Sequence, residues 1–553
     1  MKRLLVVLVS VFCFGFLAAG DPPIDVLRKK ANDGDASAQC RLGDRYVKGD
    51  GVDQNPAEAV KWYRKAAEQG HVWAQFHLGD CYFRGEGVDQ NPAEAVKWYR
   101  KAAEQGHMWA QHELACRLRN GAGVEKNLEE AVKWYRKAAA QEHRGAQRSL
   151  GDCYRNGTGV EKNLEEAVKW YRKAAVQDDM YAQCSLAVCY FKGMGVEKNL
   201  EEAAEWHRRA AEQGHSGAQR CLGDWYKNGI GVEKNPAEAV KWYRKAAEKG
   251  DVVAQCNLGD CLKSGFGTWK NPVEAVKWYR QAAEKGNSLG MIRLAGCYAE
   301  GIGVKKNPVE AVKWYRKAAE KGSPYGQFQM GVCYAGGIGV EKNPVEAVKW
   351  YRQAAEKGHL DAQCRLGDCL RAGIGVEKNP VEAVKWYRKA AGKGSSFGRI
   401  RMGDCYAGGI GVAKNPVEAV KWYRQAAEKG SPVGLFQLGV CYAKGTGVAK
   451  NPAEAVKWYL LAAEKGSVGA QCNLGDCYRS GLGVEKNFEE AVKWYRKAAE
   501  KGQRWAQFQL GVCYAKGTGV EKNPDEAVKL YRKAAKQGLP QAKKALAGLG
   551  ESL

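Results

Sequence analysis

The chain of 553 residues has few prolines, and no stretch rich in Pro, Ser or Gly separates it into domains. Its 15 prolines are far outnumbered by 67 glycines, which recur at regular intervals. Beyond the first twenty residues there is no apolar run that approaches the length of a membrane span. These absences argue against a string of separate globular domains. Evenly spaced glycine is instead typical of the turns of a repeat.

Motifs for catalysis and for metal binding are also scarce. The chain has no HExxH motif, no Walker phosphate loop and no CxxC pair. No serine is followed three residues later by lysine, so the signature of penicillin-recognising enzymes is absent. We therefore expect no enzymatic activity, no catalytic residue, no cofactor and no metal site.

The first twenty residues differ in composition from everything after them. Lys2 and Arg3 precede an apolar run over residues 4–17, and small residues follow at 18–20. This order predicts a secretory signal peptide over residues 1–20, with an uncleaved anchor as the alternative. We expect an exported protein that is periplasmic, envelope-associated or extracellular, with no transmembrane span after signal removal.

Tryptophan marks an internal repeat of 36 residues that contains no insertion. The marker positions are Trp62, Trp98, Trp134, Trp170, Trp206, Trp242, Trp278, Trp314, Trp350, Trp386, Trp422, Trp458 and Trp494, with Leu530 in the fourteenth place. The phase predicts fourteen units over residues 37–540, flanked by half-repeat caps at residues 21–36 and 541–553. A period of this length is typical of a stacked array of identical folding units.

Each repeat encodes two helices. In "KNPVEAVKWYRKAAEKG", residues 306–322, Asn307 is placed to cap a helix, Pro308 to begin it and Gly322 to end it. Its apolar residues recur at helical spacing, with the marker Trp314 beside them. We expect this tryptophan to pack into the next unit, and ligand stacking is the alternative.

The other helix of the repeat is visible in "DAQCRLGDCLRAGIG", residues 361–375, where Ala362, Leu366 and Leu370 share a face and Gly373 and Gly375 close the helix. A short turn then leads to the next capped helix. The sequence therefore predicts an all-α array of stacked antiparallel helix pairs, because one such pair cannot bury its own apolar face.

The first helix of each pair carries a second stripe that varies between units. Its residues follow the spacing i, i+3, i+4 and i+7, so each set shares one helix face, opposite the Leu78 face. Packing against the neighbouring first helix is one explanation, and a ligand-binding groove is the other. The candidate ligand-binding residues are Trp73, Phe76, His77, Asp80, Trp109, Tyr325, Phe328, Gln329, Phe397, Asp404, Phe436, Trp505, Phe508 and Gln509.

Positive charge gathers on the second helix of each pair. The formal net charge is +25, and Lys313, Arg316, Lys317 and Lys321 are expected to point outward. Such a face is usually only solvated, and attraction to an anionic envelope surface is the alternative. We expect no nucleic-acid partner, because no array of base-stacking aromatics accompanies the cations.

These motifs resemble the Sel-one-like repeat (SLR) family, a relative of the tetratricopeptide repeat. The shared pattern is A-x-x-x-L-G-x-x-Y-x-x-G-x-G-V-x-x-N-x-x-x-A-x-x-W-Y-x-x-A-A-x-x-G, and one copy begins at Ala74 and ends at Gly106. The resemblance covers nearly all of the chain after residue 20. It implies a right-handed α-solenoid whose first helices line the concave side, and a role as an adaptor or scaffold.

The 19 cysteines do not match the disulfide pattern of one branch of that family. The resemblance implies that some secreted relatives staple each repeat with a disulfide, but the two positions here hold residues such as Ala247 and Gln255. Most cysteines fall in one column, which we interpret as small buried hydrophobes. The column residues are Cys81, Cys153, Cys189, Cys261, Cys297, Cys333, Cys369, Cys405, Cys441, Cys477 and Cys513.

Together these observations favour a non-catalytic scaffold or adaptor that binds proteins or peptides through its concave groove. A basic protein that binds envelope components or an anionic polymer is the first alternative. A hydrolase of cell wall or β-lactams is the second. The repeat chemistry does not identify the partner.

Overall fold

The computed structural model describes residues 22–550, and in this range the chain forms thirty helices and no strand. The predicted signal peptide, residues 1–20, lies outside the described residues. The odd-numbered helices are α1 (Ile24–Asn32), α3 (Pro56–Glu68), α5 (Pro92–Glu104), α7 (Leu128–Ala140), α9 (Leu164–Val176), α11 (Leu200–Glu212), α13 (Pro236–Glu248), α15 (Pro272–Glu284), α17 (Pro308–Glu320), α19 (Pro344–Glu356), α21 (Pro380–Gly392), α23 (Pro416–Glu428), α25 (Pro452–Glu464), α27 (Phe488–Glu500) and α29 (Pro524–Lys536).

The even-numbered helices are α2 (Ala36–Lys48), α4 (Val72–Arg84), α6 (Met108–Asn120), α8 (Arg144–Asn156), α10 (Met180–Lys192), α12 (Ser216–Asn228), α14 (Val252–Ser264), α16 (Ser288–Glu300), α18 (Pro324–Gly336), α20 (Leu360–Ala372), α22 (Ser396–Gly408), α24 (Pro432–Lys444), α26 (Val468–Ser480), α28 (Arg504–Lys516) and α30 (Pro540–Ala547). For the helices other than α15, each even-numbered helix pairs with the odd-numbered helix that follows it, and that helix packs on the next even-numbered one. The all-α array of helix pairs is therefore as the sequence predicts.

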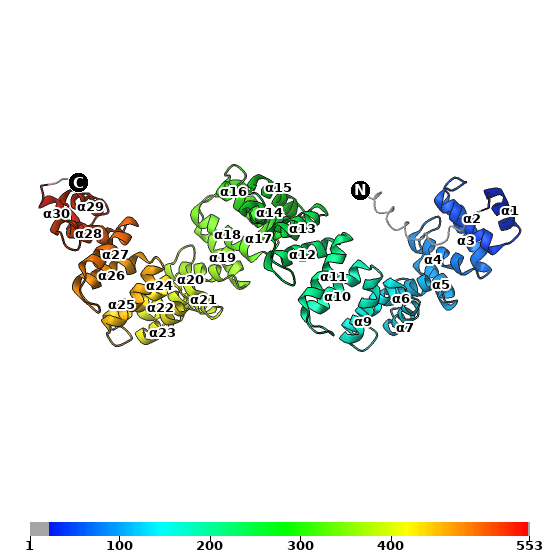
Figure 1. The fold of residues 1–553 in the computed structure, drawn as a ribbon, viewed down its shortest axis with the longest axis horizontal. Coiled ribbons are helices and arrows are strands. Elements are labelled where there is room, and N and C mark those ends of the chain that lie inside the picture. Colours follow the sequence, from blue (N-terminus) through cyan, green and yellow to red (C-terminus); the bar gives the residue numbers. More distant parts are fainter. Residues whose placement is uncertain (1–21, 551–553) are drawn as a thin grey trace. The chain divides into compact units, whose positions relative to one another are not determined.

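The chain divides into two compact units, and the boundary along the sequence lies between Trp278 and Tyr279 within α15. Unit 1 contains the described residues 22–278, and unit 2 contains residues 279–550. Within each unit the helix pairs follow one another in chain order (Figure 1). Each unit is described by itself below.

The predicted caps define the helix ends. The Asn307 side chain accepts a hydrogen bond from the Glu310 backbone N–H at 3.0 Å, and Pro308 is the first residue of α17. Proline costs nothing there, because the first N–H groups of a helix have no partner within the helix. Gly322, just after the helix, has a φ of +84°, a left-handed conformation in which a side chain would be strained.

The turn after each even-numbered helix is shaped by two glycines. Gly373 caps α20 with a φ of +74°. Gly375 also has a positive φ, and a Cβ atom there would lie 2.1 Å from the Pro344 carbonyl oxygen at the start of α19. The second glycine is required because the turn packs against the backbone of the preceding odd-numbered helix.

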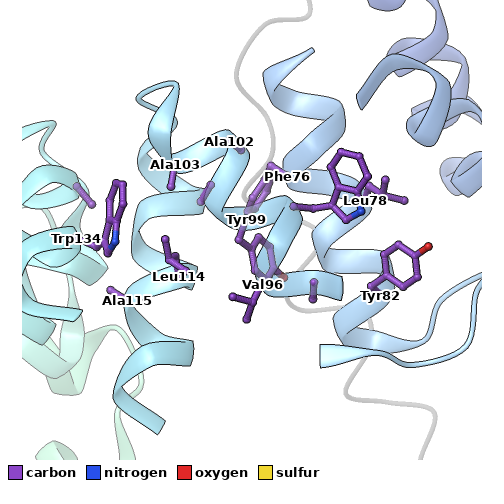
Figure 2. Packing of buried hydrophobic residues seen from close by; sticks show 14 of the residues in the cluster. Phe76, Leu78, Tyr82, Val96, Tyr99, Ala102, Ala103, Leu114, Ala115 and Trp134 are labelled. Atoms are coloured by element: carbon purple, nitrogen blue, oxygen red, sulfur yellow. The ribbon is translucent and has the colours of Figure 1, made fainter. Parts of the chain in front are cut away.

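The core lies between consecutive helices. Figure 2 shows Tyr99 of α5 between residues of α4 and of α6, among them Leu78 and Leu114, and all three are fully buried. Burying a leucine side chain contributes about 2–3 kcal/mol. The small residue Gly79 admits the Tyr99 ring, since a Cβ at Gly79 would lie 2.7 Å from the ring. Core residues therefore come from adjacent repeats, as stacking requires.

The column cysteines are small core residues, as predicted. They are buried, apart from Cys369, which is half-buried. Burial raises the pKa of Cys153 and of Cys261 to about 11, so these thiols stay protonated and unreactive near neutral pH. All cysteines in residues 22–550 are free thiols. No helix in the same range is long and apolar enough to cross a bilayer.

Candidate protein-binding surface

The variable stripe of the even-numbered helices places aromatic side chains in solvent. We define the even-helix stripe as the residues equivalent, at 36-residue spacing, to Trp73, Phe76, His77 and Asp80 of α4. At the first position Trp73 is 49% exposed and Trp109 is 38% exposed, both in unit 1. In unit 2 Tyr325 is 44% exposed and Phe397 is 39% exposed. Large exposed aromatics are unusual on a folded surface and are typical of binding sites.

Neighbouring rings hold the exposed aromatics in place. The Trp73 ring meets the His107 ring edge-on, with centroids 4.4 Å apart, and Trp109 meets His143 in the same way at 4.4 Å. In unit 2 the Trp505 Nε1–H donates to Asp476 Oδ2 at 3.3 Å. The histidines also cap the next helix, since His107 Nδ1 accepts from the Ala110 backbone N–H. A fixed aromatic loses little side-chain entropy when a partner binds.

The phenylalanines at the second position face inward. Phe76 is buried, and Phe328, Phe436 and Phe508 are half-buried. Each packs on the tyrosine of its own helix pair, and Phe328 also stacks on His359 with ring centroids 4.6 Å apart. The tyrosine contacts are Phe76–Tyr99 at 6.0 Å, Phe328–Tyr351 at 5.9 Å, Phe436–Tyr459 at 6.0 Å and Phe508–Tyr531 at 5.7 Å. These tyrosines belong to the odd-numbered helix of the same pair, whereas the packing expected from the sequence is against the neighbouring first helix.

The polar positions of the stripe form a hydrogen-bonded floor. The Tyr99 O–H donates to Asp80 Oδ1 at 2.6 Å, and Tyr423 donates to Asp404 at 2.9 Å. Burial raises the pKa of the Asp80 carboxyl. The hydrogen bond from Tyr99 lowers this pKa by less, so the net pKa is raised. The same Tyr–Asp bond joins Tyr63 to Asp44, Tyr171 to Asp152, Tyr243 to Asp224, Tyr387 to Asp368 and Tyr495 to Asp476.

The remaining candidates lie in the same layer. The Nε2 atom of His77 is 3.9 Å from Asp44 Oδ1, and its ring lies near those of Trp73 and Phe76. In unit 2 Gln329 is half-buried and Gln509 is buried. The structure thus brings the α4 candidates together as one cluster and pairs Trp505 with Phe508, at 5.6 Å between ring centroids.

Tyr181 is an exposed member of the stripe that the candidate set omits. It is 56% exposed, and the Arg148 guanidinium lies 5.2 Å from its ring centroid. Arg148 is itself held by Asp179, with Nη1 3.1 Å from Oδ2. A comparison of positions at 36-residue spacing identifies Tyr181, because it stands where α4 has Trp73 and α6 has Trp109.

The positive charge of the odd-numbered helices is largely engaged by side chains of the same helix or of the next one. Lys313 Nζ lies 3.1 Å from Glu310 Oε2, and the Lys317 ammonium lies 4.2 Å from the Trp314 ring centroid. Arg316 donates to the Tyr334 hydroxyl at 2.9 Å. The buried Trp314 ring therefore packs in the repeat and carries a cation on its face.

Two serines stand in GxSxG sequences, at residues 286–290 and 394–398. Ser288 begins α16 and Ser396 begins α22. The nucleophile turn of α/β-hydrolases joins a strand to a helix and leaves the serine at the top of a sheet. Here each motif joins two helices, and its glycines serve the turn and the close packing of Gly290 and Gly398 on the preceding helix.

The fold and the stripe define a Sel1-type α-solenoid, and the comparisons with known proteins agree. The Sel1 repeat family model matches fourteen times over residues 36–539. The matched segments are residues 36–71, 74–107, 110–143, 145–179, 181–215, 216–251, 252–287, 288–323, 324–359, 360–395, 396–431, 432–467, 468–503 and 506–539. The chain belongs to the Sel1 repeat family, whose scaffolds are typical of proteins that bind other proteins.

One solved structure shows the same fold over most of the chain. The chain is similar to a protective antigen present in uropathogenic Escherichia coli strains that displays an SLR fold, with 34% identity and a TM-score of 0.65. That match covers 88% of this chain and 97% of the antigen. A Sel1 repeat protein from Oxalobacter formigenes is also 34% identical, with a TM-score of 0.45 over 56% of this chain and 89% of that one. No curated protein sequence matches the chain.

Proposed function

We propose that this chain is an exported, non-catalytic scaffold that binds protein partners through the concave groove formed by its even-helix stripe. The exposure of Trp73, Trp109, Tyr325 and Phe397 carries the proposal. Aromatic anchors beside hydrogen-bonding groups are what protein interfaces concentrate at their centres.

The layout of the stripe favours an extended partner. The same helix position recurs every 36 residues, and in several repeats of each unit it holds an aromatic side chain. Weak contacts at several repeats add up when one partner engages them together, because each later contact is intramolecular. The Tyr–Asp bonds in the helix pairs of Trp73 and Phe397 are already formed in the free chain, so binding there does not require them to rearrange.

Export is supported by the signal-like residues 1–20 and by the relative of known structure. That relative is a protective antigen of uropathogenic Escherichia coli. An antigen that protects must be accessible to the immune system, and its match covers 88% of this chain. We infer a location in the periplasm, in the envelope or outside the cell.

The test compares two double variants of the full chain as bait for envelope extract. Tyr325→Ser with Phe397→Ser removes two anchors of the even-helix stripe in unit 2. Val309→Ser with Val381→Ser removes two apolar side chains that are at least as exposed, but on the odd-numbered helices α17 and α21. We expect partners retained by the wild type to be lost about tenfold with the first variant and kept with the second. Equal loss with both variants would contradict the proposal.

Salt dependence separates this function from binding of an anionic polymer. Attraction to a polyanion weakens steeply with ionic strength, whereas aromatic anchors are little affected by salt. We expect the same proteins to be retained when NaCl is raised about threefold from physiological strength. Retention that disappears with salt and ignores the Tyr325 and Phe397 substitutions would support the envelope-binding alternative.

A further inference from the structure

One helix pair of unit 1 replaces the recurrent Tyr–Asp bond with a thiol. In α6 and α7 the residue aligned with Asp80 and Asp152 is Cys116, and the Tyr135 O–H donates to its Sγ atom at 3.3 Å. In the neighbouring pairs this position holds an aspartate whose oxygen accepts the tyrosine hydrogen bond. The Tyr135 hydroxyl therefore offers Cys116 a hydrogen bond that is stronger to a thiolate than to a thiol.

A histidine and a carboxylate complete the cluster on the same face of α6. His112 Nε2 lies 3.6 Å from Cys116 Sγ, one helical turn away. His112 Nδ1 lies 3.5 Å from Glu113 Oε1, and the other Glu113 oxygen accepts from Arg117 at 2.6 Å. The imidazole thus stands between a thiol and a carboxylate, which is the arrangement that activates a nucleophilic cysteine.

The electrostatic balance favours a charged pair. Burial lowers the pKa of His112, but hydrogen bonds and charges from Cys116 and Glu113 outweigh it and raise this pKa to about 9. Burial raises the pKa of the Cys116 thiol. The contact with His112 and the hydrogen bond from Tyr135 outweigh burial, so the net pKa of the thiol is lowered. At Cys153, by contrast, burial prevails and raises the pKa to about 11.

Groups near the pair on other helices include Tyr135 of α7, Cys153 of α8 and His143, which caps α8, and Asp80 of α4 acts on Glu113. The His143 ring lies 4.6 Å from His112, and burial together with the His112 charge lowers its pKa to about 3. His143 is therefore neutral. Its buried Nε2 atom has no hydrogen-bond partner among the described residues.

The cluster is open to a small molecule. Cys116 and His112 are both half-buried. At the position where α4 and α6 have a tryptophan, α8 has Gly145, and a Cβ atom there would lie only 3.4 Å from His112 Nε2. The missing side chain leaves room beside the ring nitrogen that faces the thiol.

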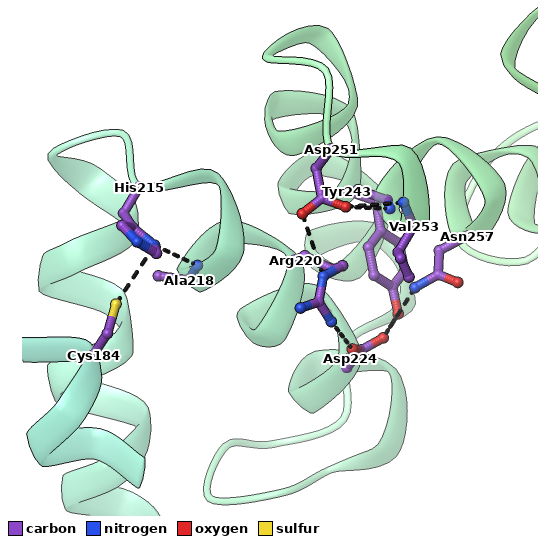
Figure 3. A network of polar contacts seen from close by, with 10 residues as sticks. Cys184, His215, Ala218, Arg220, Asp224, Tyr243, Asp251, Val253 and Asn257 are labelled. Atoms are coloured by element: carbon purple, nitrogen blue, oxygen red, sulfur yellow. Dashed lines mark hydrogen bonds and ion pairs between the residues drawn. The ribbon is translucent and has the colours of Figure 1, made fainter. Parts of the chain in front are cut away.

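A second Cys–His contact in unit 1 shows that proximity alone is not enough. Cys184 Sγ lies 3.5 Å from His215 Nδ1 (Figure 3), but the same nitrogen accepts a hydrogen bond from the Ala218 backbone N–H at 3.0 Å. Burial and the positive charge of Lys249 lower the pKa of His215. Burial raises the pKa of Cys184 to about 12. This pair is neutral, and it supplies a matched control.

We propose that Cys116 is a nucleophilic thiolate, paired with the His112 imidazolium, that undergoes thiol–disulfide exchange with small disulfides. The Cys116 sulfur attacks one sulfur of the disulfide, a new S–S bond forms and the old one breaks. The second sulfur leaves as a thiolate and takes the proton from His112, so the products are a mixed disulfide, a free thiol and neutral histidine. The adduct forms on the even-helix stripe.

The experiment measures the reaction of the full chain with DTNB, an aromatic disulfide that releases a coloured thiolate, at pH 6 in the presence of a chelator. We expect one fast equivalent, about tenfold or more faster than the other thiols, because most of them are buried and protonated. Peptide mass spectrometry should place the adduct on Cys116. A folded protein without a fast thiol would overturn the proposal.

The repeats provide substitutions that the fold already accommodates. Cys116→Asp installs the residue found at the aligned position of α4 and should abolish the fast phase. His112→Phe installs the residue aligned in α4, Phe76, keeps the thiol and should slow it at pH 6 by about tenfold to a hundredfold, with the rate recovering above the ordinary thiol pKa of about 8.5. Cys184→Ser should change nothing. A fast phase that survives either α6 substitution would refute the assignment, and circular dichroism checks each fold.

Discussion

Two regions of the chain use the same helices but join the two helices of each pair differently. In the glutamine-capped region, helices α3, α5, α7, α9 and α11 are each followed by a C-cap glutamine whose amide donates to a buried glutamine of the preceding even-numbered helix. The pairs are Gln69–Gln39 at 2.7 Å, Gln105–Gln75 at 2.8 Å, Gln141–Gln111 at 2.9 Å, Gln177–Gln147 at 2.9 Å and Gln213–Gln183 at 2.9 Å.

In the lysine-capped region, a lysine is the C-cap residue that follows α13 and the later helices α17, α19, α21, α23, α25 and α27. Lys249 donates to the Gly214 carbonyl at 2.7 Å, and the Oε1 atom of Gln219 is left buried without a partner among the described residues. Gln327, Gln363 and Gln471 have the same orphaned atom.

The difference teaches that one C-cap residue decides whether the buried glutamine of a helix pair has a hydrogen-bond partner. An amide can serve two acceptors at once: Gln141 Nε2 lies 2.9 Å from Gln111 Oε1 and 3.0 Å from the Gly106 carbonyl. The shorter amide reaches inward, whereas the long lysine stem carries its ammonium outward to solvent and to one carbonyl. An unsatisfied buried acceptor costs about 1–3 kcal/mol.

The largest expected effect tests what both regions share. Gly87→Ala and Gly339→Ala should each destabilise their repeat by about 3 kcal/mol or more. Both glycines have positive φ, and a Cβ atom would lie 2.1 Å and 2.2 Å from the carbonyl oxygens of Pro56 and Pro308. Hydrogen exchange of the flanking helices measures the loss. Gly70→Ala, with positive φ but open space around it, is the control and should cost about 1 kcal/mol.

An exchange of caps tests the comparison directly. Lys249→Gln should stabilise the junction of α12 and α13 by about 1 kcal/mol, because the new amide can reach Gln219. Gln141→Lys should destabilise the junction of α6 and α7 by about 1–2 kcal/mol. Hydrogen exchange over the two helix pairs should move in opposite directions, about fivefold for each kcal/mol. If hydrogen exchange changed in the same direction in both variants, the Gln–Gln pairs would not be the cause of the difference.

The smallest expected effect concerns ion pairs that both regions contain. Arg100 binds Glu130 at 2.7 Å and Arg352 binds Glu382 at 2.9 Å, each across one repeat junction. Burial raises the pKa of these two glutamates. The hydrogen bonds and charges of the arginines outweigh burial, so the net pKa lies below the ordinary glutamate value of 4.5. Their stabilisation is present above pH 4.5 and is lost as the pH falls through the lowered pKa.

For such half-exposed pairs the contribution is about 0.5 kcal/mol or less. Acid titration of thermal unfolding should therefore show a slightly weaker loss of stability between pH 5 and pH 3 in Glu130→Gln and in Glu382→Gln than in the wild type. Glu125→Gln, in an exposed turn, is the control. An unchanged acid slope in both junction variants would exclude the ion pairs as its source.

The local features of the fold could be predicted because their causes lie within a few residues. The bond from the Glu310 N–H to Asn307 spans three residues, and the left-handed Gly322 follows from helix termination. The glutamine ladder joins residues 30 positions apart, and the Tyr–Asp bond joins residues 19 apart. Both depend on how the two helices of one pair pack on each other, which helical periodicity does not specify.

The stripe shows the same limit. The sequence placed Trp73 and Phe76 on one face, but three residues of helix turn the second side chain toward the partner helix, so one is exposed and the other buried. Cys116 lies outside the cysteine column. Only an alignment of the repeats on Asp80 and Asp152 shows that it stands where other repeats have the aspartate bonded to a tyrosine. The contact with His112 needs the helix geometry.

The second turn glycine of each repeat also constrains how such a protein changes in evolution. Because this turn rests on the backbone of the preceding helix, an added or missing residue at the turn would displace every later contact. Duplication or deletion of a complete 36-residue segment reproduces the junction unchanged. Genes of this architecture are therefore expected to vary in length by whole repeats, and the reach of the binding surface to vary in equal steps.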